Sequence, residues 1–217
     1  MKKITLISLL LFAFTISAFS QNDKIFRFGI HGSPSFAWLK PGDKTIESDG
    51  IRLGFGYGLM TEFSLADNYS FSTGIESSYS GGKLQWINLI DTSTITTLYR
   101  VQYLEIPITL KMKTNEINYI TYFAKFGGGV GARLSAFKDE TLKKNQTTIS
   151  VEDQNIKNHV SFLRVAFHVG LGIEYSLGGS TALLVGINFN NGLTDMLKDN
   201  SISAKNNYIN INLGILF

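Results

Sequence analysis

Apolar and polar residues alternate with a period of two along most of this chain. The clearest stretch runs from Leu163 to Leu177, where every odd position is apolar and the even positions include Arg164, His168 and Glu174. The same alternation runs from Ile209 to Phe217, and no segment has a sustained helical period. A period of two is typical of β-strands with one apolar face. The pattern therefore predicts an all-β protein.

The pattern predicts eight strands, joined in turn by short and long connections. The predicted strands are Ile25–Leu39, Ile51–Leu65, Tyr69–Ile87, Thr96–Lys113, Asn118–Phe137, Val160–Leu177, Thr181–Asn190 and Asn207–Phe217. The tight turns are Ala66–Asn68, Thr114–Ile117 and Gly178–Ser180, and the longer polar connections are Lys40–Gly50, Asn88–Ser93, Lys138–His159 and Asn191–Asn206. This alternation is typical of an up-and-down antiparallel sheet with all turns at one end.

Alternation alone does not say which face of the sheet lies outside. A soluble barrel turns its apolar face inward, and a membrane barrel turns that face outward. Here the polar face is unusually small, with Gly54, Gly56 and Gly58 on one strand and Gly127, Gly129 and Gly131 on another. A narrow lumen needs such small residues. The same face also carries charges of both signs, which could pair across a lumen: Arg27, Arg52, Glu62, Glu76, Glu105, Lys111, Lys125, Arg133, Arg164 and Glu174.

Strand length and aromatic residues also favour a membrane barrel. Several predicted strands exceed the 5–6 residues usual in soluble sheets and reach the ~10 residues that a tilted transmembrane strand requires. Aromatic residues lie at both ends of the apolar face, as in the two interfacial girdles of membrane barrels. They are Trp38, Phe55, Tyr57 and Tyr79 toward the loops, and Phe63, Phe71, Tyr122, Tyr175 and Phe217 toward the turns. We therefore predict an eight-stranded antiparallel up-and-down transmembrane β-barrel.

The first twenty residues resemble an export signal. Lys2 and Lys3 precede an apolar stretch from Ile4 to Phe19, and Ala18 and Ser20 are the small residues that a signal peptidase reads. We expect residues 1–20 to be cleaved and residues 21–217 to form the barrel domain. Without Lys2 and Lys3 the formal charge falls from +3 to +1, which leaves no basic patch for nucleic acid. The 217-residue chain contains no Cys, which excludes disulfides and thiolate chemistry.

Three features resemble a known family. They are the run Tyr103-Leu104-Glu105-Ile106-Pro107 followed by Lys111, the glycine-rich run Gly127–Gly131, and the terminal Phe217. Together they are similar to the PorT-like family of small outer-membrane β-barrel proteins of Bacteroidota. The resemblance implies an outer-membrane barrel, and the member that gives the family its name belongs to a secretion apparatus. It also implies that the C-terminal strand is read by the barrel assembly machinery, through Ile209, Ile211, Leu213, Ile215 and Phe217.

Candidate chemistry in the sequence is weak. The run Gly127–Ala132 fits a dinucleotide-binding fingerprint, but no amphipathic helix follows it. His31 with Ser33 or Ser35, or His168 with Glu174, could serve a lipid-modifying enzyme if they came within hydrogen-bond reach. No spacing of His with carboxylates indicates a metal site, and we expect no cofactor. Pro107 lacks an N–H donor and should mark a bulge or a break in strand pairing.

The sequence therefore predicts a non-catalytic outer-membrane protein with a structural or interaction role, and the setting suggested by the family is a secretion apparatus. A small channel for solutes or ions is the main alternative, and a lipid-modifying enzyme is a weaker one. Expected contacts are outer-membrane lipids, the assembly machinery during biogenesis, and a protein partner at the extracellular loops. An even strand number places both termini in the periplasm. The connection Lys138–His159 is the longest, and we expect a solvated loop there.

Overall fold

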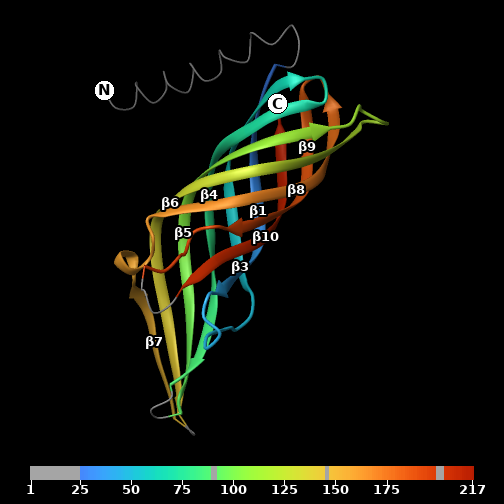
Figure 1. The fold of residues 1–217 in the computed structure, drawn as a ribbon. Coiled ribbons are helices and arrows are strands. Elements are labelled where there is room, and N and C mark those ends of the chain that lie inside the picture. Colours follow the sequence, from blue (N-terminus) through green and yellow to red (C-terminus); the bar gives the residue numbers. More distant parts are fainter. Residues whose placement is uncertain (1–24, 89–91, 145–146, 199–202) are drawn as a thin grey trace, which may run out of the picture.

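The chain folds into one closed, antiparallel β-barrel (Figure 1). A computed structural model describes residues 25–88, 92–144, 147–198 and 203–217, so the predicted export signal lies outside the described residues. Eight long strands form the ring. They are β1 (Phe26–Pro41), β3 (Arg52–Ala66), β4 (Tyr69–Ile87), β5 (Thr94–Lys113), β6 (Ile120–Lys144), β8 (Leu163–Gly178), β9 (Thr181–Gly192) and β10 (Ala204–Leu216).

Each of these strands pairs with its neighbours in the chain, and β1 pairs with β10 to close the ring. In the described part of the chain, two short strands lie outside the ring: β2 (Glu47–Ser48) pairs with β4, and β7 (Thr147–Asn155) pairs with β6. The tight turns and the C-terminus lie at one end of the barrel, and the longer connections lie at the other (Figure 1). We call these the turn end and the loop end. The eight-stranded antiparallel topology predicted from the sequence is confirmed.

The apolar face of the sheet points outward. On β8, Leu163, Phe167, Leu171 and Tyr175 are exposed, while the even-numbered residues from Arg164 to Glu174 turn into the lumen. Aromatic pairs form at both ends of the apolar band, where the sequence predicted the two aromatic girdles. Near the loop end the ring centroids of Tyr57 and Tyr79 are 6.5 Å apart, and near the turn end those of Phe26 and Phe63 are 5.2 Å apart. A membrane barrel has this inside-out arrangement, with an apolar band between two aromatic girdles.

The strands at the loop end are longer than the sequence predicts. The connection expected to be a solvated loop over Lys138–His159 instead continues β6 to Lys144 and returns as β7. A short 3₁₀ helix, η2 (Lys157–His159), then leads into β8. Charged, amide and hydroxyl residues make up most of this hairpin, so its polar composition hid its strand character. Among the described residues, no helix has the length and apolar character needed to cross a membrane.

Pro107 interrupts one strand pairing, as expected. The β4–β5 ladder pairs Thr73 with Ile108 and Glu76 with Glu105 in one register, but no pairing is recorded between them, opposite Ile106 and Pro107. The register does not shift, so the feature is a break and not a bulge. The hydroxyl of Thr73 donates a hydrogen bond of 2.7 Å to the Pro107 carbonyl, which ties the two strands at the break.

Candidate functional site

The lumen is the candidate site, because it gathers the charged residues singled out in the sequence. Four of them form a single cluster near the turn end: Arg27 on β1, Glu62 on β3, Lys111 on β5 and Glu174 on β8. Each lies between residues that point outward, so the strand period alone turns it into the lumen. All four side chains are buried.

In this cluster, which we call the ionic cluster, each of the two cations contacts both carboxylates. The guanidinium of Arg27 lies 2.5 Å from Glu62 and 2.7 Å from Glu174, and the ammonium of Lys111 contacts both carboxylates. That ammonium also lies 4.3 Å from the ring centroid of Phe123. Two cations therefore face two anions, and the pairing offsets the cost of removing the four charges from water. The ionic cluster fills the lumen at this level.

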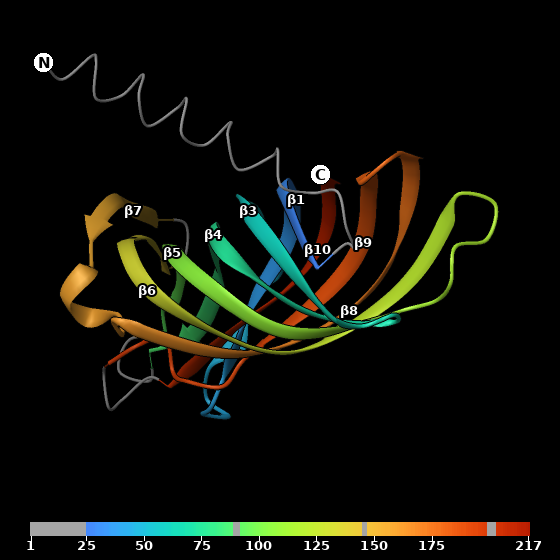
Figure 2. The ribbon, with the colours of Figure 1, turned by 90° about the horizontal axis from the view of Figure 1, so that it is seen from above.

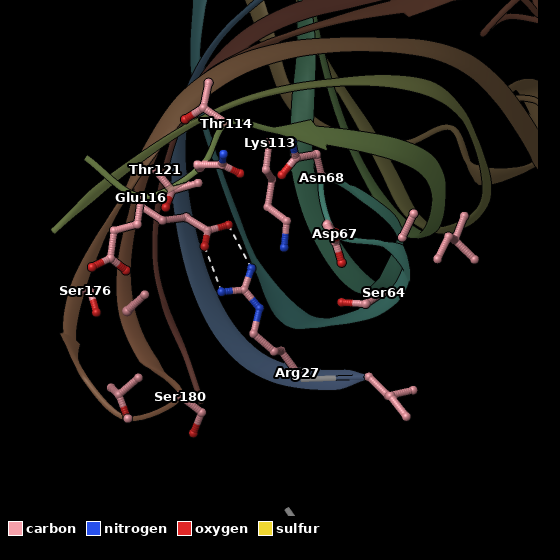
Figure 3. Close-up of a pocket in the computed structure, with 18 residues that line it drawn as sticks. Arg27, Ser64, Asp67, Asn68, Lys113, Thr114, Glu116, Thr121, Ser176 and Ser180 are labelled. Carbon is pink, nitrogen blue, oxygen red and sulfur yellow. Dashed lines mark hydrogen bonds and ion pairs between the residues drawn. The ribbon is translucent and has the colours of Figure 1, made fainter. Parts of the chain in front are cut away.

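A cavity of about 780 Å³ lies beyond the ionic cluster at the turn end. Figure 3 shows Arg27 and its bonds at the inner wall of this cavity, with Lys113 reaching into it. Hydroxyl, amide and carboxylate side chains line its mouth, among them Asn68, Glu116 and Ser180. The turn end is therefore an open polar recess that ends at the ionic cluster.

A second group of polar residues lies in the middle of the lumen. Nε2 of His31 lies 3.6 Å from the Glu76 carboxylate, and the Ser33 hydroxyl donates a hydrogen bond of 3.2 Å to the same carboxylate. Lys125 and His168 line the same small cavity, which has a volume of about 50 Å³. Several asparagine oxygens there have no protein partner within the described residues. A cavity of this size can hold a few waters, which such groups require.

Two further lumen charges meet nearer the loop end. The guanidinium of Arg164 lies 2.9 Å from the Glu105 carboxylate and stacks over the rings of Tyr103 and Tyr208. Glu105 also accepts a hydrogen bond of 3.0 Å from the Ser78 hydroxyl. These contacts give the Tyr103–Pro107 run, on which the family resemblance rests, a structural role in the lumen.

Arg133 and Arg52 are held by carbonyl groups and not by carboxylates. Arg133 donates to the Val160 carbonyl and Arg52 to the Ser80 carbonyl. All ten charged residues picked from the sequence thus point inward. They form separate groups along the barrel axis instead of one continuous network.

The loop end is closed by an apolar cap that the sequence did not reveal. Its members come from strands and from three of the connections, and the cluster comprises Leu39, Ile46, Leu84, Tyr99, Val101, Tyr103, Ala136, Ile156, Val160, Met196, Leu197 and Ala204. The connections are tied together by backbone hydrogen bonds, including 2.7 Å from Ser161 to Met196 and 2.9 Å from Lys198 to His159. The isolated apolar residues within polar loops were the only signal for this cap.

Ion pairs outside the lumen connect β5 to the hairpin that β6 and β7 form at the loop end. Arg100 on β5 binds Asp139 on β6 at 2.7 Å and Asp153 on β7 at 2.6 Å. Its hydrogen bond to Asp153 is the main favourable cause that raises the pKa of the guanidinium above its ordinary value. The sequence did not single out these residues, because their pairing depends on the unexpected strand β7.

The structure does not assemble the catalytic pairs considered from the sequence. Glu174 is bound by Arg27 and not by His168. Ser33 donates to Glu76, so the serine is not bonded to the imidazole of His31 that would have to activate it. The glycine run that resembles a dinucleotide fingerprint lies wholly within β6. Among the described residues, no group of three or more His, Asp or Glu is arranged to hold a metal ion.

The C-terminal residues expected to carry the assembly signal lie on β10 and just after it. Ile209, Ile211, Leu213 and Phe217 are exposed on the outer face. The backbone of Phe217 exchanges hydrogen bonds with Phe28, at 2.7 and 3.3 Å, beyond the last paired residue of β10.

The sequence of the chain matches a known protein family. Residues 19–198 match the family described as "Outer membrane protein beta-barrel domain". The chain belongs to this family. It is an outer-membrane β-barrel protein, and no curated protein matches its sequence significantly.

Solved structures of outer-membrane barrels are similar to this barrel protein at low identity. Neisserial surface protein A is 9% identical, with a TM-score of 0.47 over 87% of this chain and 95% of that one. OprG from Pseudomonas aeruginosa is 16% identical, with a TM-score of 0.39 over 91% and 98%. The outer membrane protease OmpT from Escherichia coli is 10% identical, with a TM-score of 0.41 over 88% and 96%. At these identities and TM-scores the likenesses carry no information about activity.

Proposed function

We propose that this protein is a non-catalytic, non-conducting outer-membrane barrel that binds another protein at its loop end. The observation that carries the proposal is the blocked lumen. The ionic cluster fills it near the turn end, and the apolar cap closes it at the loop end. An eight-stranded barrel has an interior just wide enough for side chains, so such blocks leave no wide aqueous path.

The lengths of the connections support one orientation in the membrane. Membrane barrels have short periplasmic turns and longer extracellular loops. We therefore place the turn end and both termini in the periplasm, after cleavage of residues 1–20. The resemblance to the PorT-like family supports a secretion apparatus as the setting.

Single-channel recording tests the closed lumen. Purified barrels, with folding verified by a shift in electrophoretic migration on heating, are inserted into planar lipid bilayers. We expect no steady conductance above background. Reproducible conductance steps from the folded fraction would overturn the proposal and favour a small channel.

Native mass after mild detergent extraction from the outer membrane tests the interaction role. We expect other proteins to co-migrate with the barrel in a fixed ratio. A mass of one chain plus its micelle in every detergent tried would contradict that role.

A further inference from the structure

Strand β7 has a free edge at the loop end. It pairs with β6 on one side, and within the described residues no strand pairs with its other side. Figures 1 and 2 show it at the outer side of the hairpin, beyond the ring. Eight of its nine residues are exposed. On a free edge, alternate backbone N–H and C=O groups point outward and can pair with another chain.

The side chains beside this edge form an apolar row. Cross-strand pairing aligns Trp86 on β4 with Ile95 on β5, Ile95 with Leu142 on β6, and Leu142 with Ile149 on β7. Directly paired residues lie on the same face of a sheet. The row starts at Trp86, which packs against the apolar cap, and ends at the free edge, where Ile149 is 57% exposed.

Val151 lies on the same face as Ile149, two pairs closer to the barrel, and is 46% exposed, although its partner on β6 is the charged Glu140. The opposite face of the hairpin is polar and carries Thr148 and Ser150. The edge is therefore amphipathic. A strand added to β7 would extend the apolar row if its own residues alternated between apolar and polar.

The regular part of the edge, Thr147–Val151, lacks two of the devices that keep strands apart, and a bulge follows it before Gln154. Natural edge strands are commonly protected by lysine, proline or inward-pointing charge. The β7 sequence, Thr147–Asn155, contains no Lys, Arg or Pro, and its only charges are Glu152 and Asp153. Arg100 holds Asp153 in place, so the strand is already formed before a partner arrives. Preformed structure lowers the entropic cost of binding.

We propose that β7 binds an extended segment of a partner protein, which adds to the sheet as a further antiparallel or parallel strand. The segment would alternate apolar and polar side chains and carry a basic residue near Glu152, since Asp153 is already bound by Arg100. Backbone hydrogen bonds would supply much of the affinity, and the apolar row would select the side chains. This inference rests on the proposed function and names the surface and the kind of partner.

A second copy of this chain fits the edge poorly within one membrane. Two β7 strands paired antiparallel, with their apolar faces aligned, would invert one barrel relative to the other. Two β7 strands could also pair in parallel about a two-fold axis, and both barrels would then stay upright. In that arrangement, however, Ile149 of one copy and Ile149 of the other would lie on opposite faces of the joined sheet. Neither arrangement keeps both the membrane orientation and the apolar row.

A synthetic peptide of alternating valine and threonine, flanked by lysines, tests the proposal on the full barrel in lipid nanodiscs. Its affinity is measured by fluorescence anisotropy, and hydrogen–deuterium exchange reports on β7. A second peptide, N-methylated at alternate backbone positions, lacks the donors that strand addition needs. We expect the first peptide to bind and to slow exchange in β7, and the methylated peptide to bind at least about tenfold more weakly.

Ile149→Lys is the test variant, and Ile117→Lys is its matched control. Ile117 is also 57% exposed but lies in a turn at the opposite end of the barrel. We expect Ile149→Lys to weaken peptide binding about tenfold or more and Ile117→Lys to leave it unchanged. Equal binding by both variants, equal binding of the methylated peptide, or unchanged exchange in β7 would overturn the proposal.

Two outcomes separate this inference from the proposed function. A stable dimer that Ile149→Lys disrupts would show that a second copy occupies the edge, and it would overturn the foreign partner. Conductance from a barrel that still binds the peptide would overturn the proposal that the lumen is closed, but it would not contradict the proposed binding site on β7.

Discussion

Arg27 and Glu174 meet across the lumen through two hydrogen bonds of 2.7 and 2.9 Å, although 147 positions separate them in the chain. One lies on the first strand and the other on β8. Their contact joins distant walls of the barrel, and it defines both the inner end of the recess and the core of the ionic cluster.

Replacing one member of the ionic cluster should strongly destabilise the barrel. Glu174→Gln leaves Arg27 and Lys111 with a single carboxylate between them, and breaking a buried pair in this way costs about 3–5 kcal/mol. The free energy of unfolding, measured by urea titration in lipid vesicles, should fall by about that amount. Glu116→Gln, at the exposed mouth of the recess, should change it by less than about 0.5 kcal/mol.

A second substitution should partly rescue this loss. Adding Lys111→Met to Glu174→Gln leaves Arg27 facing Glu62, so that one cation is again matched to one anion. The double variant should be more stable than Glu174→Gln alone. A double variant no more stable than the single one would show that charge balance does not govern this cluster.

Gly127 should not tolerate a larger residue. A Cβ at this position would lie 2.7 Å from the Cα of Thr109 and closer still to the Ile108 carbonyl oxygen. Both atoms belong to backbone held in the β5–β6 ladder, so Gly127→Ala should lower the free energy of unfolding by about 1–3 kcal/mol. At Gly32 the nearest atom would be a Phe55 ring carbon at 3.4 Å, and Gly32→Ala should be close to neutral.

Arg100→Gln should loosen β7 without unfolding the barrel. The substitution removes the contacts to Asp139 and Asp153, and an exposed ion pair contributes only about 0–1 kcal/mol to global stability. Hydrogen exchange should therefore quicken in β7 and remain unchanged in β8 and β9. Lys138→Gln, which removes a contact to Glu140 within the same strand, is the control and should leave β7 exchange as it is.

Cysteine labelling in whole cells should report the orientation. Because the natural sequence contains no Cys, single substitutions give unambiguous labels. A membrane-impermeant maleimide should label Ser150→Cys in intact cells, and it should label Asn115→Cys only after the outer membrane is permeabilised. The reverse pattern would put the turn end outside.

Phe217→Ala should slow assembly more than it lowers stability. The backbone of Phe217 would keep its bonds to Phe28, while the exposed aromatic ring that we expect the assembly machinery to read would be lost. The folded fraction in pulse-labelled cells should fall. Equal folding of variant and wild type in vivo would contradict a signal at this residue.

The fold was predictable because a period of two fixes which residues share a face. The positions of Arg27, Glu62 and Glu174 in the lumen follow from that period and from the decision that the apolar face lies outside. Their partners were not predictable, since pairing across a lumen depends on strand stagger. Nothing local in the sequence sets that stagger.

The loop end was the least predictable part. In β7 only Ile149 and Val151 are apolar, so its alternation is too short to distinguish Thr147–Asn155 from an ordinary polar loop. Ile46 and Met196 join the apolar cap from connections that are otherwise polar. Single apolar residues within loops are common, and they show a shared role only when the tertiary structure brings them together.

The ionic cluster has a consequence for how the chain enters the membrane. Arg27 and Glu62 lie on adjacent strands and can pair early, but Lys111 and Glu174 lie on β5 and β8, with β6 between them. A sheet that has not yet curled into a ring leaves their charges facing hydrocarbon. The last ion pairs and the β1–β10 seam must therefore form together, so that crossing the bilayer and closing the ring become one cooperative event.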